Sequence, residues 1–388
     1  MNLKNILVTG LSGFWGEIFA SYLDERDEYE KIIGIDSIPP KKTFKRVKYR
    51  EWNPINESIL QILEEEKIDG VCHLNFIPVK FHDEKMFQRN VLGAMNLLSA
   101  CVRLKIQKVA MMSSFIVYGA KGSNPNFIPE ESSTQRKRFA YQENNDLLEI
   151  DDYVTDFIRL YPDFHLTMLR FCSIIGPTVN TPMTKYLSYP VVPTLLGFDP
   201  MFQFIHEQDV LHALAHALQS DYHGVVNVAA SDVVPLSKAK KICSQTAIPL
   251  FHPIAYTLSQ FLNNIKLARL RLLEVDFLRY NCIVDTIRMK EQFQFVPEKT
   301  AEETLREFAE HRRLKQIFPL EKNVRELESS ARLGFHWGTE KVKSKIEEQI
   351  QSFLNKRHLP TTEQLESLSQ RIDQISERID QLAGNRHV

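Results

Sequence analysis

The chain has 388 residues, of which 43% are hydrophobic and 25% are charged, so a disordered, collagen-like or membrane-bundle protein is excluded. Its 48 Lys and Arg residues balance 49 Asp and Glu residues to a net charge of −1, which gives no general reason to expect nucleic acid as a partner. No apolar run reaches the roughly 18 residues that a membrane span requires.

The cysteines and the N-terminus bear on the compartment. The five cysteines are widely spaced and include no CxxC pair, which favours small buried thiols over a disulfide scaffold or a zinc ribbon. Residues 1–10 lack the long apolar core of a signal peptide. We therefore expect a cytoplasmic protein.

Short apolar strands alternate with longer amphipathic helices in the first two thirds of the chain. The strands have no strict alternation, as expected when helices cover both faces of a sheet. Expected strands are 5–9, 31–36, 47–52, 70–74, 108–113 and 166–171, and expected helices are 13–24, 59–66, 87–104 and 146–160. This order predicts an α/β fold with a Rossmann-type, doubly wound parallel sheet over residues 1–175.

From residue 176 onward the pattern loosens. Five prolines interrupt residues 177–200, and short elements follow, so we expect a smaller mixed α/β domain over 176–313, interleaved with the first. The apolar segment 182–197 lines a weakly polar pocket or packs in the core, and we favour packing. Residues 314–360 look like a polar helical extension.

A heptad pattern occupies residues 361–388. Six apolar residues follow each other at spacings of 3, 4, 3, 4 and 3, namely Leu365, Leu368, Ile372, Ile375, Ile379 and Leu382. This repeat predicts a coiled coil that joins copies of the chain into a homo-oligomer. The alternative is a helix that docks its apolar stripe on its own domain.

Three glycines lie between the first expected strand and the first expected helix. Gly10 permits a tight turn, Gly13 lets backbone approach a pyrophosphate, and Gly16 lets the helix pack against the strand. The N-terminus of the helix then offers free N–H groups to phosphates. The spacing predicts a dinucleotide site, and the alternative is a tight turn without a ligand.

Asp36 ends the second expected strand, 20 residues beyond Gly16. This spacing is expected for an acid that holds the hydroxyls of the adenosine ribose. Because its charge would repel a 2′-phosphate, NAD is favoured over NADP as the cofactor. The basic segment 41–50 is expected to be a solvated loop and edge strand, with contact to a cofactor phosphate as the alternative.

Several segments resemble the extended short-chain dehydrogenase/reductases, the NAD-dependent epimerase/dehydratase family, over about residues 4–310. They include VTGLSGFWG at 8–16, NVLGAMNLLSAC at 90–101, MMSSFIVYG at 111–119 and FIHEQDV at 204–210. The resemblance is greatest to a bacterial subgroup similar to UDP-glucose 4-epimerases, in which the active-site tetrad is not always complete. It implies NAD as cofactor and a small-molecule substrate, for which a nucleotide sugar is one candidate.

The resemblance also implies roles for particular residues. Ser114 falls at the catalytic Ser/Thr, Asn90 at the supporting asparagine and Tyr141 at the catalytic tyrosine, although Tyr141 is equally compatible with a plain loop tyrosine. The residues implied to contact the cofactor are Gly10, Ser12, Gly13, Phe14, Trp15, Gly16, Asp36, Asn53, Leu74, Asn75 and Asn90.

The sequence departs from the family at the catalytic lysine. Asn145 stands four residues after Tyr141, and none of the twelve tyrosines has a lysine at that spacing. A neutral amide cannot favour a tyrosinate as a cation does, so acid–base catalysis is weakened. Two further departures concern the substrate. The sugar-nucleotide epimerases of the family place a phosphate-binding arginine near the position of Phe202, and they often have asparagine where Ser173 stands.

The histidines indicate no metal site. His73 and His206 have no second His or Cys at ligand spacing, and Asp209 is expected to cap a helix that begins at Val210.

Two functions remain open. The chain is an epimerase/dehydratase-like enzyme or oxidoreductase, or it is a non-catalytic NAD-binding sensor or scaffold. A fold that has lost its cofactor is the third alternative.

Overall fold

The computed structural model describes residues 3–54, 58–74, 84–132, 134, 145–257 and 275–317. The chain divides into two compact units, Met1–Phe308 and Ala309–Val388, and only the last residues of helix α10 (Ala301–Ile317) are described in the second. The coiled-coil prediction for 361–388 and nearly all of the extension over 314–360 therefore lie outside the described residues. Among the described helices, none has the length and apolar character needed to span a bilayer.

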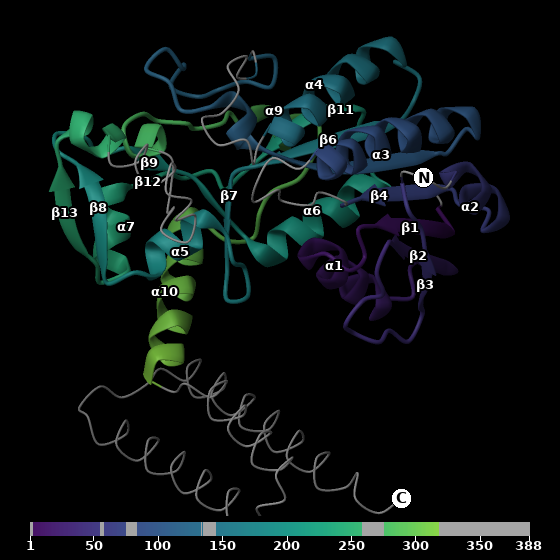
Figure 1. The fold of residues 1–388 in the computed structure, drawn as a ribbon, viewed down its shortest axis with the longest axis horizontal. Helices are drawn as coiled ribbons and strands as arrows, with labels where there is room; N and C mark the ends of the chain where they lie inside the picture. The colour runs from purple at the N-terminus through teal and green to yellow at the C-terminus, as the bar shows by residue number, and fades with distance from the viewer. Residues whose placement is uncertain are drawn as a thin grey trace, which may run out of the picture. The chain divides into compact units, whose positions relative to one another are not determined.

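The central sheet has seven strands in the order β11-β6-β5-β4-β1-β2-β3, and every neighbouring pair is parallel (Figure 1). The strands are β1 (Asn5–Thr9), β2 (Lys31–Asp36), β3 (Val47–Glu51), β4 (Gly70–His73), β5 (Lys108–Ser114), β6 (Leu166–Phe171) and β11 (Gly224–Val228). The chain reverses its direction of progress across the sheet between β1 and β4. This reversal creates a topological switch point, where ligands of such sheets bind at the carboxyl ends of the strands.

Helices cover both faces of the sheet, as predicted. Helices α1 (Phe14–Asp24) and α6 (Glu207–Gln219) pack on one face, whereas α2 (Ile59–Glu65), α3 (Glu84–Arg103) and α4 (Asn145–Leu160) pack on the other. The predicted strands and helices are confirmed with shifts at their ends, the largest at α3, which begins at Glu84 rather than residue 87.

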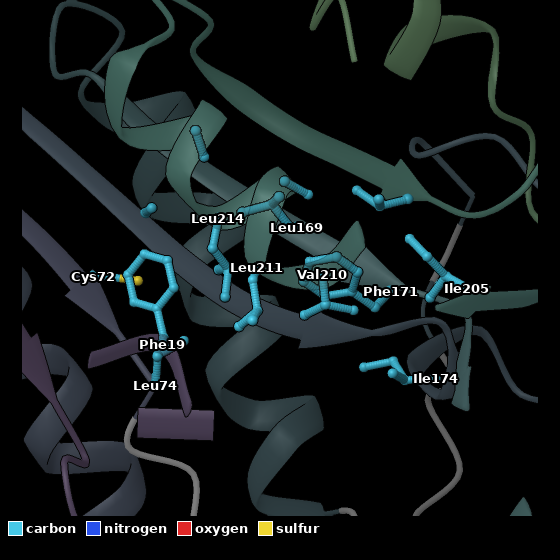
Figure 2. Packing of buried hydrophobic residues seen from close by; sticks show 14 of the residues in the cluster. Phe19, Cys72, Leu74, Leu169, Phe171, Ile174, Ile205, Val210, Leu211 and Leu214 are labelled. Atoms are coloured by element: carbon cyan, nitrogen blue, oxygen red, sulfur yellow. The ribbon is translucent and has the colours of Figure 1, made fainter. Parts of the chain in front are cut away.

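Successive residues of one strand serve opposite layers of the core. In β1, Ile6 and Val8 pack with the α1 and α6 layer, whereas Leu7 packs with the α2, α3 and α4 layer. Figure 2 shows Phe19 of α1 and Leu211 of α6 in the first of these layers. Because helices cover both faces of the central strands, β1 and β4 are buried over nearly their whole length, which explains why the sequence shows no alternation there, whereas the edge strand β3 has only Val47 buried.

The remaining elements form small sheets and short helices. Strand pairs are β10–β7, β12–β9 and β13–β8. The bounds are η1 (Phe115–Tyr118), β7 (Ser173–Ile175), α5 (Pro182–Ser188), β8 (Val191–Leu195), β9 (Met201–Phe202), β10 (Phe204–His206), β12 (Val234–Pro235), α7 (Leu236–Ile242), β13 (Thr246–Leu250), η4 (Val275–Leu278) and α9 (Ile287–Glu291). Between these short elements, β11 returns to the edge of the main sheet. The domain limits at 175 and 313 stay a prediction.

The apolar segment 182–197 serves packing, as we favoured. Met183, Tyr186 and Leu187 of α5 and Val192 and Leu195 of β8 are buried. Phe202, which stands near a family arginine, is also buried, and its ring stacks on Phe204 at a centroid distance of 6.1 Å.

The predicted cap of α6 is wrong. The helix begins at Glu207, and His206 is its N-cap, with Nδ1 accepting the N–H of Gln208 at 3.2 Å. Asp209 is therefore inside the first turn, where its carboxylate accepts the N–H groups of Glu298 at 2.9 Å and Lys299 at 3.4 Å. A ring nitrogen can replace the usual hydroxyl or carboxylate as a cap acceptor, which the helix pattern alone does not indicate.

Candidate functional site

The glycine turn lies at the carboxyl end of β1. Gly10 has φ 72°, in the left-handed region that favours glycine. A Cβ on Gly16 would lie 1.9 Å from the carbonyl oxygen of Gly10, so only glycine lets α1 start this close to the strand. These two steric roles agree with the prediction from spacing, whereas cofactor binding by the turn stays a prediction.

The first turn of α1 is open to an anion. Its N-cap is Gly13, which has no side chain to accept the N–H groups of the residues that follow, Phe14, Trp15 and Gly16. Ser12 does not substitute for it, because its hydroxyl donates to the carbonyl of Ile38 at 2.5 Å. The unpaired N–H groups and the helix dipole make this end a suitable place for phosphate.

Asp36 is the last residue of β2 and is joined to the glycine turn. Its Oδ2 accepts the N–H of Ser12 at 3.0 Å, and its Oδ1 accepts the N–H of Ser37 at 2.7 Å and the hydroxyl of Ser37 at 3.4 Å. The N–H groups of Gly10 and Leu11 bond to the carbonyl of Ile35 in the same strand. The turn and the acid are therefore held in one arrangement.

Below this turn, a buried pair joins β1 to β4. Thr9 Oγ1 lies 2.8 Å from His73 Nδ1 and also accepts the N–H of Leu74 at 3.2 Å. Burial lowers the pKa of His73 to about 4, so the ring is neutral near pH 7. His73 is thus a structural residue at the switch point. Leu74 is buried beside it, and Asn53, half-buried, follows β3.

Ser114 ends β5, at the same edge of the sheet as Gly10 and Asp36, because all three strands are parallel. Its Oγ accepts the N–H of Ile116 at 3.4 Å and caps η1. The oxygen is the acceptor in this bond, so within the described residues the hydroxyl hydrogen of Ser114 is not used by a hydrogen bond.

Tyr118 is close to Ser114 in the chain, but its hydroxyl is buried and hydrogen-bonded within the core. Burial raises the pKa of Tyr118 to about 12. Its hydroxyl donates to Asn227 Oδ1 at 2.8 Å and accepts from Arg170 Nη1 at 2.8 Å. The predicted base, Tyr141, lies outside the described residues, as does Asn75.

Asn90 is tied to the start of α4. Its Nδ2 donates to Asp146 Oδ2 at 2.9 Å, and both side chains are buried. Asn145 is the first residue of this helix, and its side chain is not described. The structure therefore places Asn90 beside the first turn of α4, which begins at Asn145. Nothing in the spacing indicated Asp146 as its partner.

A buried ion pair supports β5 and β6 behind Ser114. Arg170 donates to Asp151 through Nε at 3.1 Å and Nη2 at 2.5 Å, and each side chain is at most 1% exposed. Asp151 also accepts the hydroxyl of Ser113 at 2.5 Å. Charge and hydrogen bonds from Asp151 hold the pKa of Arg170 above its usual range although burial opposes this.

A parallel sheet with a glycine turn and an acid at its switch point defines a protein of the Rossmann class. The model of the NAD dependent epimerase/dehydratase family matches residues 6–229, more than half of the chain, and the chain belongs to this family. The resemblance seen in the sequence is thereby confirmed.

Three known proteins illustrate the similarity. An uncharacterised protein of Mycobacterium tuberculosis is 29% identical over 345 residues, which cover 87% of this chain and 91% of that protein. The structure of UDP-glucose 4-epimerase from Thermotoga maritima with UDP-glucose has a TM-score of 0.60 at 18% identity, over 80% of this chain and 99% of that chain. The dTDP-glucose 4,6-dehydratase of Bacillus anthracis in complex with NAD has a TM-score of 0.59 at 16% identity, over 79% and 96%. These structures confirm the predicted fold.

Proposed function

We propose that the chain binds NAD at the carboxyl edge of the sheet and acts on a nucleotide sugar as an epimerase or oxidoreductase with weakened acid–base machinery. The observation that carries the proposal is the Asp36 carboxylate held against the glycine turn, with its Oδ2 3.0 Å from the N–H of Ser12. Related proteins support it, since the B. anthracis dehydratase was solved with NAD and the T. maritima epimerase with UDP-glucose.

The residues present fit the cofactor. The close approach of Gly16 to Gly10 and the uncapped start of α1 leave room and donors for a pyrophosphate. The Asp36 carboxylate accepts three donors from Ser12 and Ser37, so one of its roughly four lone-pair positions remains for a ribose hydroxyl. When bound, NAD supplies a hydride acceptor and donor.

The substrate-side chemistry is assigned to residues of the chain itself. Ser114 donates its hydroxyl to a substrate oxygen, and Tyr141 removes or returns the hydroxyl proton. Asn145 contacts the nicotinamide ribose without supplying the positive charge that would lower the pKa of a tyrosine. Since positioned acid–base catalysis contributes about 10²–10⁴-fold in rate, turnover should be slow.

The test is a turnover assay on the full chain with NAD and UDP-glucose, in which products are separated by chromatography. Asn145→Lys should raise the rate, because it restores a cation near the proposed base. Asn144→Lys is the matched control, since it adds the same charge one position earlier and should not raise the rate. Tyr141→Phe should abolish turnover, and full activity in this variant would reject Tyr141 as the base.

A second candidate function is a non-catalytic NAD-binding sensor or scaffold. The neutral Asn145 in place of lysine favours it. Calorimetry and the turnover assay together distinguish the two: heat of binding with NAD but no conversion of UDP-glucose, even by Asn145→Lys, supports the sensor or scaffold. Absence of any heat with NAD would reject both functions.

A further inference from the structure

A positive charge reaches the end of β2 from helix α3. Arg89 lies one residue before Asn90, and its Nη2 donates a hydrogen bond to the hydroxyl of Ser37, the residue after Asp36. Its Nε is buried and has no hydrogen-bond partner. Within the described ranges, Ser37 is the one polar partner of this side chain, and no carboxylate pairs with it.

The guanidinium of Arg89 has N–H donors without an acceptor among the described residues. Partly buried charges are usually paired, and a guanidinium has five N–H donors in a plane that suits a phosphate or carboxylate. The hydroxyl of Ser37 satisfies one of them. The remaining N–H donors, including the unpaired Nε, could bind an anion, and no residue in the described part of the chain provides one.

The position of Arg89 selects which anion. Pyrophosphate belongs at the glycine turn and at the start of α1, whereas the ribose hydroxyls of adenosine belong at the acid that ends β2. Ser37 follows that acid directly, so the guanidinium that bonds to it stands on the ribose side of the site. A phosphate on the 2′-oxygen would lie within reach of both.

The charge of Asp36 is partly balanced in place. Three donors bond to its carboxylate, from the N–H of Ser12 and from the N–H and hydroxyl of Ser37. The repulsion on which the prediction of NAD over NADP depends is therefore reduced by these bonds and opposed by Arg89.

Two residues of the basic segment 41–50 are bonded elsewhere and do not place their positive charge at Ser37. Arg46 pairs with Asp27 at 3.2 Å, and Lys42 donates to the hydroxyl of Ser21 at 2.9 Å. Arg89, from a different layer of the fold, is the cation in contact with the residue after Asp36.

We propose that Arg89 and Ser37 form a phosphate subsite at the adenosine ribose, so that the cofactor site accepts NADP as well as NAD. The proposal rests on the proposed cofactor binding. It makes Arg89 a specificity-determining residue, since it adds a charge-assisted bond that NAD cannot form.

The experiment is calorimetric titration of the full chain with NAD, NADP and the fragment 2′,5′-ADP. Wild type should bind all three. Arg89→Met keeps the apolar stem and should weaken NADP and 2′,5′-ADP by on the order of tenfold or more while NAD changes less than about twofold. Arg89→Lys keeps the charge and should retain part of the NADP affinity. Arg103→Met, on the exposed last turn of the same helix, is the matched control.

The outcomes separate the two proposals. Binding of NAD without measurable binding of NADP or 2′,5′-ADP would overturn the phosphate subsite and leave cofactor binding intact. Equal weakening of NAD and NADP in Arg89→Met would also overturn it, because Arg89 would then contact a part shared by both cofactors. Binding of none of the three would reject the cofactor site itself. Circular dichroism of each variant establishes that it is folded.

Discussion

Replacing Asp151 by Asn tests how far the buried ion pair supports the site. The change keeps the shape of the side chain but leaves the Arg170 guanidinium, 1% exposed, without its counter-ion. Arg170 would keep bonds to the hydroxyl of Tyr118 and the carbonyl of Glu130, which are uncharged. Removing one partner of a buried ion pair costs about 3–5 kcal/mol, because the other charge remains in a medium of low polarity.

The assay is equilibrium unfolding in urea, together with thermal unfolding. With an unfolding entropy of about 2.1 cal/mol/K per residue, the unit Met1–Phe308 shifts its melting temperature by about 1.5 °C per kcal/mol, so Asp151→Asn should lower the melting temperature by about 5–8 °C. Asp152→Asn is the matched control, because the neighbouring carboxylate is exposed and bonds only to the hydroxyl of Thr134 among the contacts described. It should change stability by less than about 0.5 kcal/mol.

A double variant tests whether the stability is lost because Arg170 keeps an unpaired charge or because the side chains around it pack less well. Arg170→Met combined with Asp151→Leu removes both charges and should recover much of the lost stability, since apolar replacements of buried pairs are often neutral. A loss under about 1 kcal/mol in Asp151→Asn would refute the reasoning, because the charge of Arg170 would then be solvated rather than buried.

Three further predictions concern other parts of the chain. Gly16→Ala should abolish NAD binding by calorimetry, because the new Cβ would lie 1.9 Å from the Gly10 carbonyl oxygen; unchanged affinity would contradict the described turn. The His206 ring, whose Nε2 lies 3.4 Å from a carboxylate oxygen of Glu307, and the Lys299 ammonium bonded to the same oxygen lower the pKa of Glu307 from 4.5 to about 2. The stabilising effect of this carboxylate is therefore present above pH 4.5 and fades as the pH falls toward 2. Glu307→Gln should therefore melt below wild type at pH 7, and a difference that persists unchanged at pH 2 would be inconsistent with this. Removal of residues 361–388 should lower the number of chains per particle measured by light scattering, and an unchanged number would reject the coiled coil.

The sequence alone was sufficient for six of the seven strands of the sheet and for the glycine turn, whereas the edge strand β11 was not predicted. The central strands are short, largely apolar runs, and the covering helices have their own local periodicity, so these elements are encoded within a few neighbouring residues. The roles of Gly10 and Gly16 are likewise local, because a turn between a strand and a helix restricts only the residues in it.

Partners at long range required the tertiary structure. Asn90 meets Asp146 across 56 positions, and Arg89 meets Ser37 across 52. No periodic pattern relates such residues, because the register in which α3 packs against α4 and against the end of β2 depends on the shapes of all the side chains between them. The cap of α6 was missed for a related reason, since the ring of His206 replaces the acceptor that a sequence pattern indicates.

The sequence by itself thus determines the class of fold, the glycine turn and the absence of a lysine four residues after Tyr141, because each of these features lies in one contiguous segment. The tertiary structure alone decides which charges are compensated. Arg170 is neutralised by Asp151, whereas Arg89 has only the hydroxyl of Ser37 among the described residues. The sequence does not distinguish these two arginines. They differ because electrostatic energy depends on the distance to the nearest opposite charge, and the fold sets that distance.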